Sequence, residues 1–161
     1  MEEAILVHIM YLRVPRPGSD DAKAFTGHLG GPGENDIMET QAPSATLYDR
    51  IGGAESLRRI ASDLVDAHIV NPTIAPRFSA IDQEVAKQHA FEFFCMGSGG
   101  SEPYTGRDLR EVHTGMNVSE QEFLAAVDDL MLVMQQNNVG EREQQEVLFI
   151  FFSLRGQVLH I

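Results

Sequence analysis

The side chain with the clearest capacity for chemistry is His113, which closes the segment Gly99–His113 (GGSEPYTGRDLREVH). The glycines and the proline predict a loop, followed by a short helix with Leu109 and His113 on one side, four residues apart. A neutral imidazole is a good ligand for iron or zinc. No pattern of cysteine or carboxylate neighbours accompanies it, so an all-protein metal cage is not predicted. The chemistry that fits is the single protein ligand of a metal that brings its own donors, as haem iron does.

The elements that must position this histidine are helical. From Thr46 onward the apolar residues follow helical periodicity, and no strand alternation appears. Ser119 and Glu122 form a capping box at the start of one helix, and Pro72 ends another. The pattern predicts an all-α fold, with helices near residues 46–51, 54–70, 82–97, 109–113, 119–138 and 141–160.

The composition limits the classes of function. A chain of 161 residues predicts one domain with room for a proper core. Its 24 acidic and 12 basic side chains give a net charge of −12, which argues against nucleic acid and anionic membranes as partners. The single cysteine, Cys95, suits a reducing cytosol, and we expect it to be a small buried hydrophobe in a cytoplasmic protein. No apolar run approaches the ~20 residues of a transmembrane helix.

The first 45 residues differ from the rest. The apolar stretch Ala4–Leu12 is short and follows two glutamates, so it does not resemble a secretory signal. Glycines and prolines are dense in the ranges 15–21 and 30–33, as they are in linkers. We therefore expect residues 1–45 to be a poorly ordered extension and residues 46–161 to be the compact domain.

Four motifs, in this order and at these spacings, carry a resemblance to a known family. They are Leu47–Gly53 (LYDRIGG), Asn71–Pro72 followed by Phe78, the glycine pair before Tyr104–Gly106, and Leu109–His113 (LREVH). Together they resemble the truncated (2-on-2) haemoglobins of group I, over about two thirds of the chain. The resemblance implies a globin-like 2-on-2 helical sandwich over residues 46–161.

The resemblance also implies a cofactor, haem b, with its iron bound by His113. Leu109, one turn earlier, would pack on the ring. Further haem contacts are expected from Phe78, Phe93, Met116 and Val118. Arg107 or Arg110 is a candidate partner for a haem propionate, because arginine suits carboxylates.

The opposite, distal side departs from the family pattern. Val65 stands where the family usually has tyrosine, and Leu64 where phenylalanine is common. Ala86 and Ala90 occupy helical positions that often carry a polar residue. His89 is then the remaining distal candidate, as a hydrogen-bond partner or sixth iron ligand. In an alternative register, Gln88 lies over the iron instead.

The leading functional hypothesis is a globin that reversibly binds O₂, NO or CO at the iron. The family implies oxygen transport or nitric oxide detoxification, the latter a dioxygenase activity that needs a reductase partner. One alternative is a six-coordinate sensor or electron-transfer module, with iron held by His113 and His89. Another is a haem-free, globin-like interaction domain. His68 is expected to be a core or interface histidine.

Overall fold

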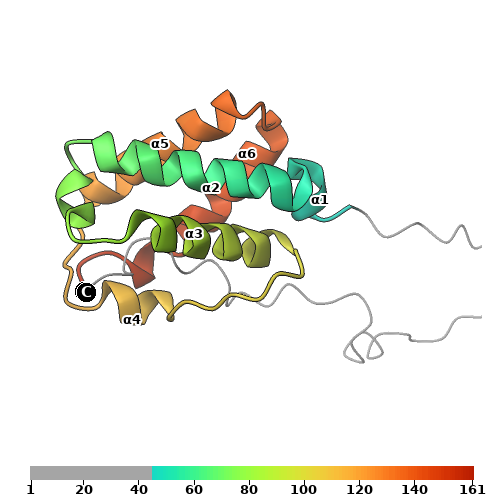
Figure 1. The fold of residues 1–161 in the computed structure, drawn as a ribbon. Coiled ribbons are helices and arrows are strands. Elements are labelled where there is room, and N and C mark those ends of the chain that lie inside the picture. Colours follow the sequence, from blue (N-terminus) through green and yellow to red (C-terminus); the bar gives the residue numbers. More distant parts are fainter. Residues whose placement is uncertain (1–44) are drawn as a thin grey trace, which may run out of the picture. The chain divides into compact units, whose positions relative to one another are not determined.

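The computed structural model describes residues 45–161, so the predicted extension lies, except for Ala45, outside the described residues. The helices are α1 (Leu47–Ile51), α2 (Gly53–Val70), α3 (Gln83–Ser98), α4 (Leu109–His113), α5 (Glu120–Gln136) and α6 (Glu141–Ser153), with short 3₁₀ helices η2 (Ala75–Phe78) and η3 (Arg155–Gln157) (Figure 1). Within this range the only β pairing is an isolated bridge between Val118 and Leu159. The all-α prediction is confirmed.

Local sequence signals explain where the helices begin. Thr46 caps α1 by accepting a hydrogen bond from the Asp49 N–H, and the Asp49 side chain returns the contact. Asp82 caps α3 in the same way, through the N–H groups of Glu84 and Val85. The predicted capping box of Ser119 and Glu122 opens α5.

The predicted extent of the last helix is wrong. We expected a helix to about His160, but α6 ends at Ser153 and gives way to η3. Gly156 has a low helix propensity, which weakens the continuation. The remaining backbone instead pairs with the segment after α4, where the Asn117 N–H donates to Ile161 O at 2.9 Å and the His160 N–H to Val118 O at 3.1 Å. These tertiary hydrogen bonds replace those of a longer helix.

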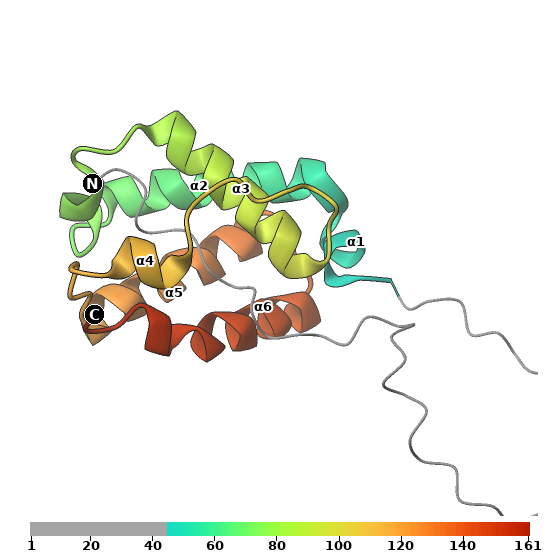
Figure 2. The same ribbon diagram turned by 90° about the horizontal axis from the view of Figure 1, so that it is seen from below.

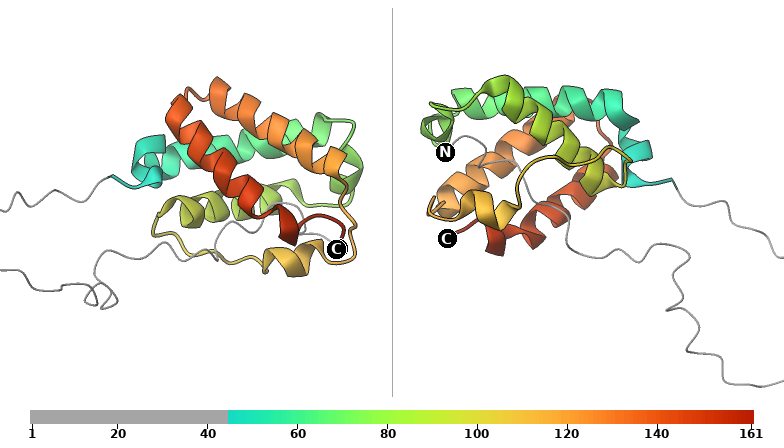
Figure 3. Two further views of the ribbon diagram at one scale, coloured as in Figure 1. Left: turned by 180° about the vertical axis from the view of Figure 1, so that it is seen from behind. Right: turned by 60° about the horizontal axis from the view of Figure 1, so that its bottom comes forward.

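The domain is built from two helix pairs. α2 packs on α3, and the pair formed by α5 and α6 crosses α2, as Figures 1 and 3 show. The main core lies between them and contains the fully buried Leu57, Ile60, Leu64, Leu130 and Met134. A second, smaller cluster joins α3 and α4 to the end of the chain and contains Phe93, Leu109, Val112 and Leu154. α4 therefore lies against its own small core, and it is drawn below α3 in Figure 1 and to the side of α2 and α3 in Figure 2.

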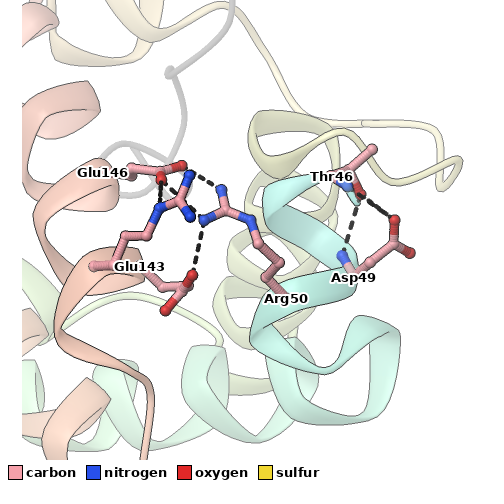
Figure 4. A network of polar contacts seen from close by, with 6 residues as sticks. Thr46, Asp49, Arg50, Glu143 and Glu146 are labelled. Carbon is pink, nitrogen blue, oxygen red and sulfur yellow. Dashed lines mark hydrogen bonds and ion pairs between the residues drawn. The ribbon is translucent and has the colours of Figure 1, made fainter. Parts of the chain in front are cut away.

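A polar network fixes α1 to α6. The Arg50 guanidinium donates to Glu143 Oε1 at 2.7 Å and also pairs with Glu146 (Figure 4). Arg142 contacts the same Glu146 from within α6. Burial opposes the charged form of Glu146, but the Arg50 hydrogen bond is the larger effect and lowers its pKa. The network ties the first described helix to the last.

Candidate cofactor pocket

An apolar pocket opens beside α4. It has about 730 Å³ of empty volume, including the space at its open mouth. Ligand sites in proteins are typically concave and mostly apolar, with a few polar side chains, and this pocket has that character. Its apolar walls come from every helix except α1, and they comprise Leu64, Ile74, Phe93, Phe94, Leu109, Met116, Val118, Phe123, Ala126, Phe151, Leu154 and Val158.

His113 lies in this pocket and is only 2% exposed. Its Nδ1 is 2.8 Å from Leu109 O, the carbonyl one turn earlier on α4. A carbonyl oxygen can only accept, so Nδ1 carries the proton and the lone pair of the neutral ring is on Nε2. Metal-binding histidines commonly have this arrangement, in which one ring nitrogen is held by an oxygen and the other is the ligand.

The helix that carries His113 is itself held in place. Asp108 caps α4 by accepting hydrogen bonds from the N–H groups of Arg110 and Glu111. The loop before it is fixed to α3 by Glu92, whose Oε2 accepts from the Thr105 N–H at 2.9 Å and from its hydroxyl at 2.7 Å. Burial alone would raise the pKa of Glu92, but these bonds and one from Gln88 outweigh it and lower the pKa.

Half of the predicted haem contacts meet in the pocket. His113, Phe93, Leu109, Met116 and Val118 all line it. They come from α3, from α4 and from the segment that follows α4. The apolar, proximal part of the predicted site is thus brought together by the fold.

The other predicted residues do not line the pocket. Phe78, Val65, Ala86 and Ala90 are buried in the main core instead. His89 is half-buried on α3, and its ring meets the Tyr104 ring edge at a centroid distance of 6.3 Å.

Gln88, the residue of the alternative register, is not among the pocket residues either. It is exposed, and its amide accepts a hydrogen bond from Arg58 and donates one to Glu92. Arg107 and Arg110 are also exposed and lie outside the pocket lining.

Three polar residues of the pocket were not predicted as site residues. His68, which we expected to be a core or interface histidine, is buried against Phe78 and also lines the pocket. Arg77 and Glu122 form an ion pair there, with 2.7 Å between Nε and Oε1. The hydrogen bond from Arg77 is the main reason that the pKa of Glu122 falls to about 2, against the effect of burial. The spacing of Leu64 and His68, four residues apart on α2, was the available signal, since both must face the same side.

The donor chemistry of the pocket fits a porphyrin metal better than a bare ion. Within residues 45–161, no three His, Cys, Asp or Glu side chains gather where they could hold a metal ion. A haem supplies four of its own donors and needs one buried imidazole and apolar walls, which is what the pocket presents.

Among residues 45–161, no helix is both long and apolar enough to cross a membrane.

Comparison with known proteins decides the family. The model of the bacterial-like globins matches residues 46–160. The chain belongs to this globin family. Group 1 truncated haemoglobin GlbN of a Nostoc species is 25% identical over 116 residues, covering 72% of this globin and 98% of that protein. The resemblance to group I truncated haemoglobins is confirmed.

Solved structures agree on the fold. The Fe(III) form of truncated haemoglobin from Tetrahymena pyriformis superposes with a TM-score of 0.70 at 20% identity, over 73% of this globin and the whole of that chain. The 2/2 haemoglobin of a Synechococcus species, solved with covalently attached haem, has a TM-score of 0.67 at 26% identity, over 71% and 98% of the two chains. The truncated 2-on-2 arrangement is therefore the fold of this globin.

Proposed function

We propose that this globin binds haem b in the pocket beside α4, with Nε2 of His113 as the iron ligand. The observation that carries the proposal is the environment of the His113 ring. The ring is buried in the wall of an apolar pocket, and its Nδ1 is held by Leu109 O. Family membership, which implies haem, supports the same reading.

When bound, ferrous haem supplies the capacity to bind O₂, NO or CO reversibly. The residues of the chain provide the setting. The backbone contact keeps the His113 ring in one orientation and one tautomer. Leu109 and Phe93 are both buried, and they would keep water away from the face of the haem on which His113 lies. A dry site matters because water promotes the oxidation of ferrous haem.

We propose reversible binding of the diatomic gases O₂, NO or CO as the primary activity. Oxygen transport and nitric oxide detoxification are the roles that the family implies. The second role would convert NO and O₂ to nitrate at the expense of one electron from the bound cofactor, so it would need a reductase partner to return that electron. The cytoplasm, with its reducing conditions, is the compartment we propose for either role.

The alternative of a six-coordinate module through His113 and His89 makes a different prediction. It requires His89 to turn from Tyr104 toward the haem, and a ferrous spectrum with bis-histidyl bands that His89→Ala abolishes. A haem-free interaction domain predicts that the protein takes up no haem at all.

The test is the absorption spectrum of the haem-reconstituted protein in ferric, ferrous and CO forms. We expect a Soret band, a CO-dependent shift and roughly one haem per chain. His113→Gly should lose normal iron coordination, and added imidazole should restore it by filling the space of the missing ring. His160→Ala, an exposed histidine near the C-terminus, is the matched control. Normal coordination in the His113→Gly protein without imidazole would refute the proposal.

A further inference from the structure

A second buried histidine lies in the same pocket. His68, on α2, is 2% exposed and lines the pocket together with Leu64, one turn away on the same helix. His113 reaches the pocket from α4, which is separate from α2 in both views (Figures 1 and 2). The two imidazoles therefore enter one cavity from different elements.

The orientation of the His68 ring is fixed by a carboxylate. Its Nδ1 is 2.8 Å from Oδ2 of Asp129 on α5. The amide of Asn71, just after α2, donates to both oxygens of the same carboxylate at 3.0 Å. Asp129 is thus held by a second partner, so it cannot turn away from His68 without losing these bonds.

This contact determines which ring nitrogen carries the proton. An ionised carboxylate only accepts hydrogen bonds, so Nδ1 of His68 is the donor. In the neutral ring the lone pair then lies on Nε2. Among residues 45–161, no hydrogen bond to Nε2 of His68 is found. A carboxylate–histidine pair of this kind is the usual support of a histidine that acts through its other nitrogen.

The other polar side chains near the pocket are less suited to act on a ligand. Arg77 donates a hydrogen bond from Nε to Glu122 and another from one terminal nitrogen to Met116 O. Glu122 accepts from Arg77 and from Ser119. His89 packs on Tyr104 and is not part of the pocket wall.

We propose that His68, oriented by Asp129, is the polar side chain on the ligand side of the haem, and that it presents the Nε2 lone pair to the ligand. This inference rests on the proposed haem function. It assigns to His68 the distal position for which the sequence suggested His89.

The proposal has a spectroscopic signature in the ferrous CO complex. A lone pair near the CO oxygen opposes transfer of electron density from iron to CO, which strengthens the C–O bond and raises its stretching frequency. An N–H donor at the same place has the opposite effect. The CO stretch therefore reports both the presence and the tautomer of His68.

The experiment compares infrared spectra of the CO complexes of four haem-loaded proteins. We expect His68→Leu to shift the C–O stretch to lower frequency than in the wild type. Asp129→Asn should shift it lower still, because an asparagine amide can donate to Nδ1 and move the ring proton to Nε2. His89→Leu, the matched control, should leave the band unchanged. Circular dichroism and haem content check that each variant folds and loads.

The outcomes separate this inference from the proposed function. An unchanged band in His68→Leu, or a band moved only by His89→Leu, overturns the assignment of His68. A wild-type band in Asp129→Asn overturns the tautomer. If the wild-type chain takes up no haem, or His113→Gly retains normal coordination, the proposed function itself fails, and does so before any CO spectrum is compared.

Discussion

The Glu92 carboxylate on α3 accepts two hydrogen bonds from a single residue, Thr105, through its backbone N–H and its hydroxyl. Glu92 is 8% exposed, and Thr105 lies in the loop that leads to α4. This contact joins α3 to the loop before α4, and both of these helices contribute residues to the pocket wall. Glu92 and Thr105 are 13 positions apart in the sequence. The position of His113 relative to α3 therefore depends on the buried Glu92 carboxylate, which holds the loop before α4.

The first prediction concerns this contact. Glu92→Ala should destabilise the folded protein by about 1–3 kcal/mol, because Thr105 and Gln88 lose a charged acceptor. Haem loss from the reconstituted protein should be several-fold faster, since the loop before α4 is no longer held. Urea unfolding and the transfer of haem to an apoglobin acceptor measure the two effects.

A matched control for Glu92 is Glu84→Ala, an exposed glutamate in the first turn of the same helix. Glu84→Ala should leave the rate of haem loss unchanged.

The pKa of Glu92 is lowered in the folded state. The stabilising effect of its carboxylate is therefore present above pH 4.5, the ordinary glutamate value, and is lost as the pH falls below 4.5. Equal haem-loss rates for Glu92→Ala and Glu84→Ala would contradict the role of the contact.

The second prediction is acid sensitivity from the ion pair at the pocket. The pKa of Glu122 is lowered from 4.5 to about 2, chiefly by the hydrogen bond from Arg77. A depressed carboxyl pKa stabilises the folded state above the unfolded value, so up to about 3 kcal/mol is present above pH 4.5 and is lost progressively toward pH 2. Unfolding free energies measured between pH 5 and pH 2 should show this slope.

Glu122→Gln isolates the contribution of the charge, because glutamine can still complete the capping box with Ser119. The slope between pH 5 and pH 2 should become shallower in this variant. Glu141→Gln, on the exposed start of α6, should keep the wild-type slope. If both variants follow the wild type, Glu122 is not a source of the acid sensitivity.

The third prediction concerns Cys95, which is fully buried on α3. Burial, reinforced by the nearby Glu102 carboxylate, raises the pKa of the thiol to about 12. The thiolate is the reactive form, so Cys95 should be inert to iodoacetamide at pH 8 in the folded protein and should react in urea. Mass spectrometry of the alkylated chain gives the extent of reaction. Rapid labelling of the native protein would contradict the predicted burial and pKa.

The local features of the fold, and the placement of His113 and Leu109 together on one side of a short helix, were predictable from sequence. The caps at Asp82 and Ser119 lie within three residues of their partners, and Leu109 and His113 are one turn apart. Such contacts need no knowledge of the tertiary structure. Loop glycines and the stop at Pro72 are equally local.

The proposed distal part of the site depends on long-range contacts and was not predictable. His68 meets Asp129 across 61 positions of sequence, and nothing near either residue indicates the other. Val65 was expected near the haem, but successive helical residues point about 100° apart. Since Leu64 and His68 face the pocket, Val65 is turned into the main core.

The last prediction uses two glycines with opposite surroundings. A Cβ added at Gly100 would lie 2.6 Å from Cδ2 of the Tyr48 ring and 2.8 Å from Glu102 Oε2. Tyr48 is itself held by a hydrogen bond from its hydroxyl to Glu102 at 2.9 Å, so the ring cannot move freely. Gly100→Ala should therefore destabilise the protein by about 1–3 kcal/mol through overpacking.

Gly156→Ala is the control for this glycine, because no atom of residues 45–161 lies within 4 Å of a Cβ added there. This substitution should be neutral or stabilise by about 0.4–1 kcal/mol, since alanine restricts the unfolded chain more than glycine does. Tyr48→Phe combined with Gly100→Ala should recover part of the loss, because without its hydroxyl the ring is released from Glu102 and can turn aside. Equal melting temperatures for Gly100→Ala and Gly156→Ala would contradict the close packing of Tyr48 on Gly100.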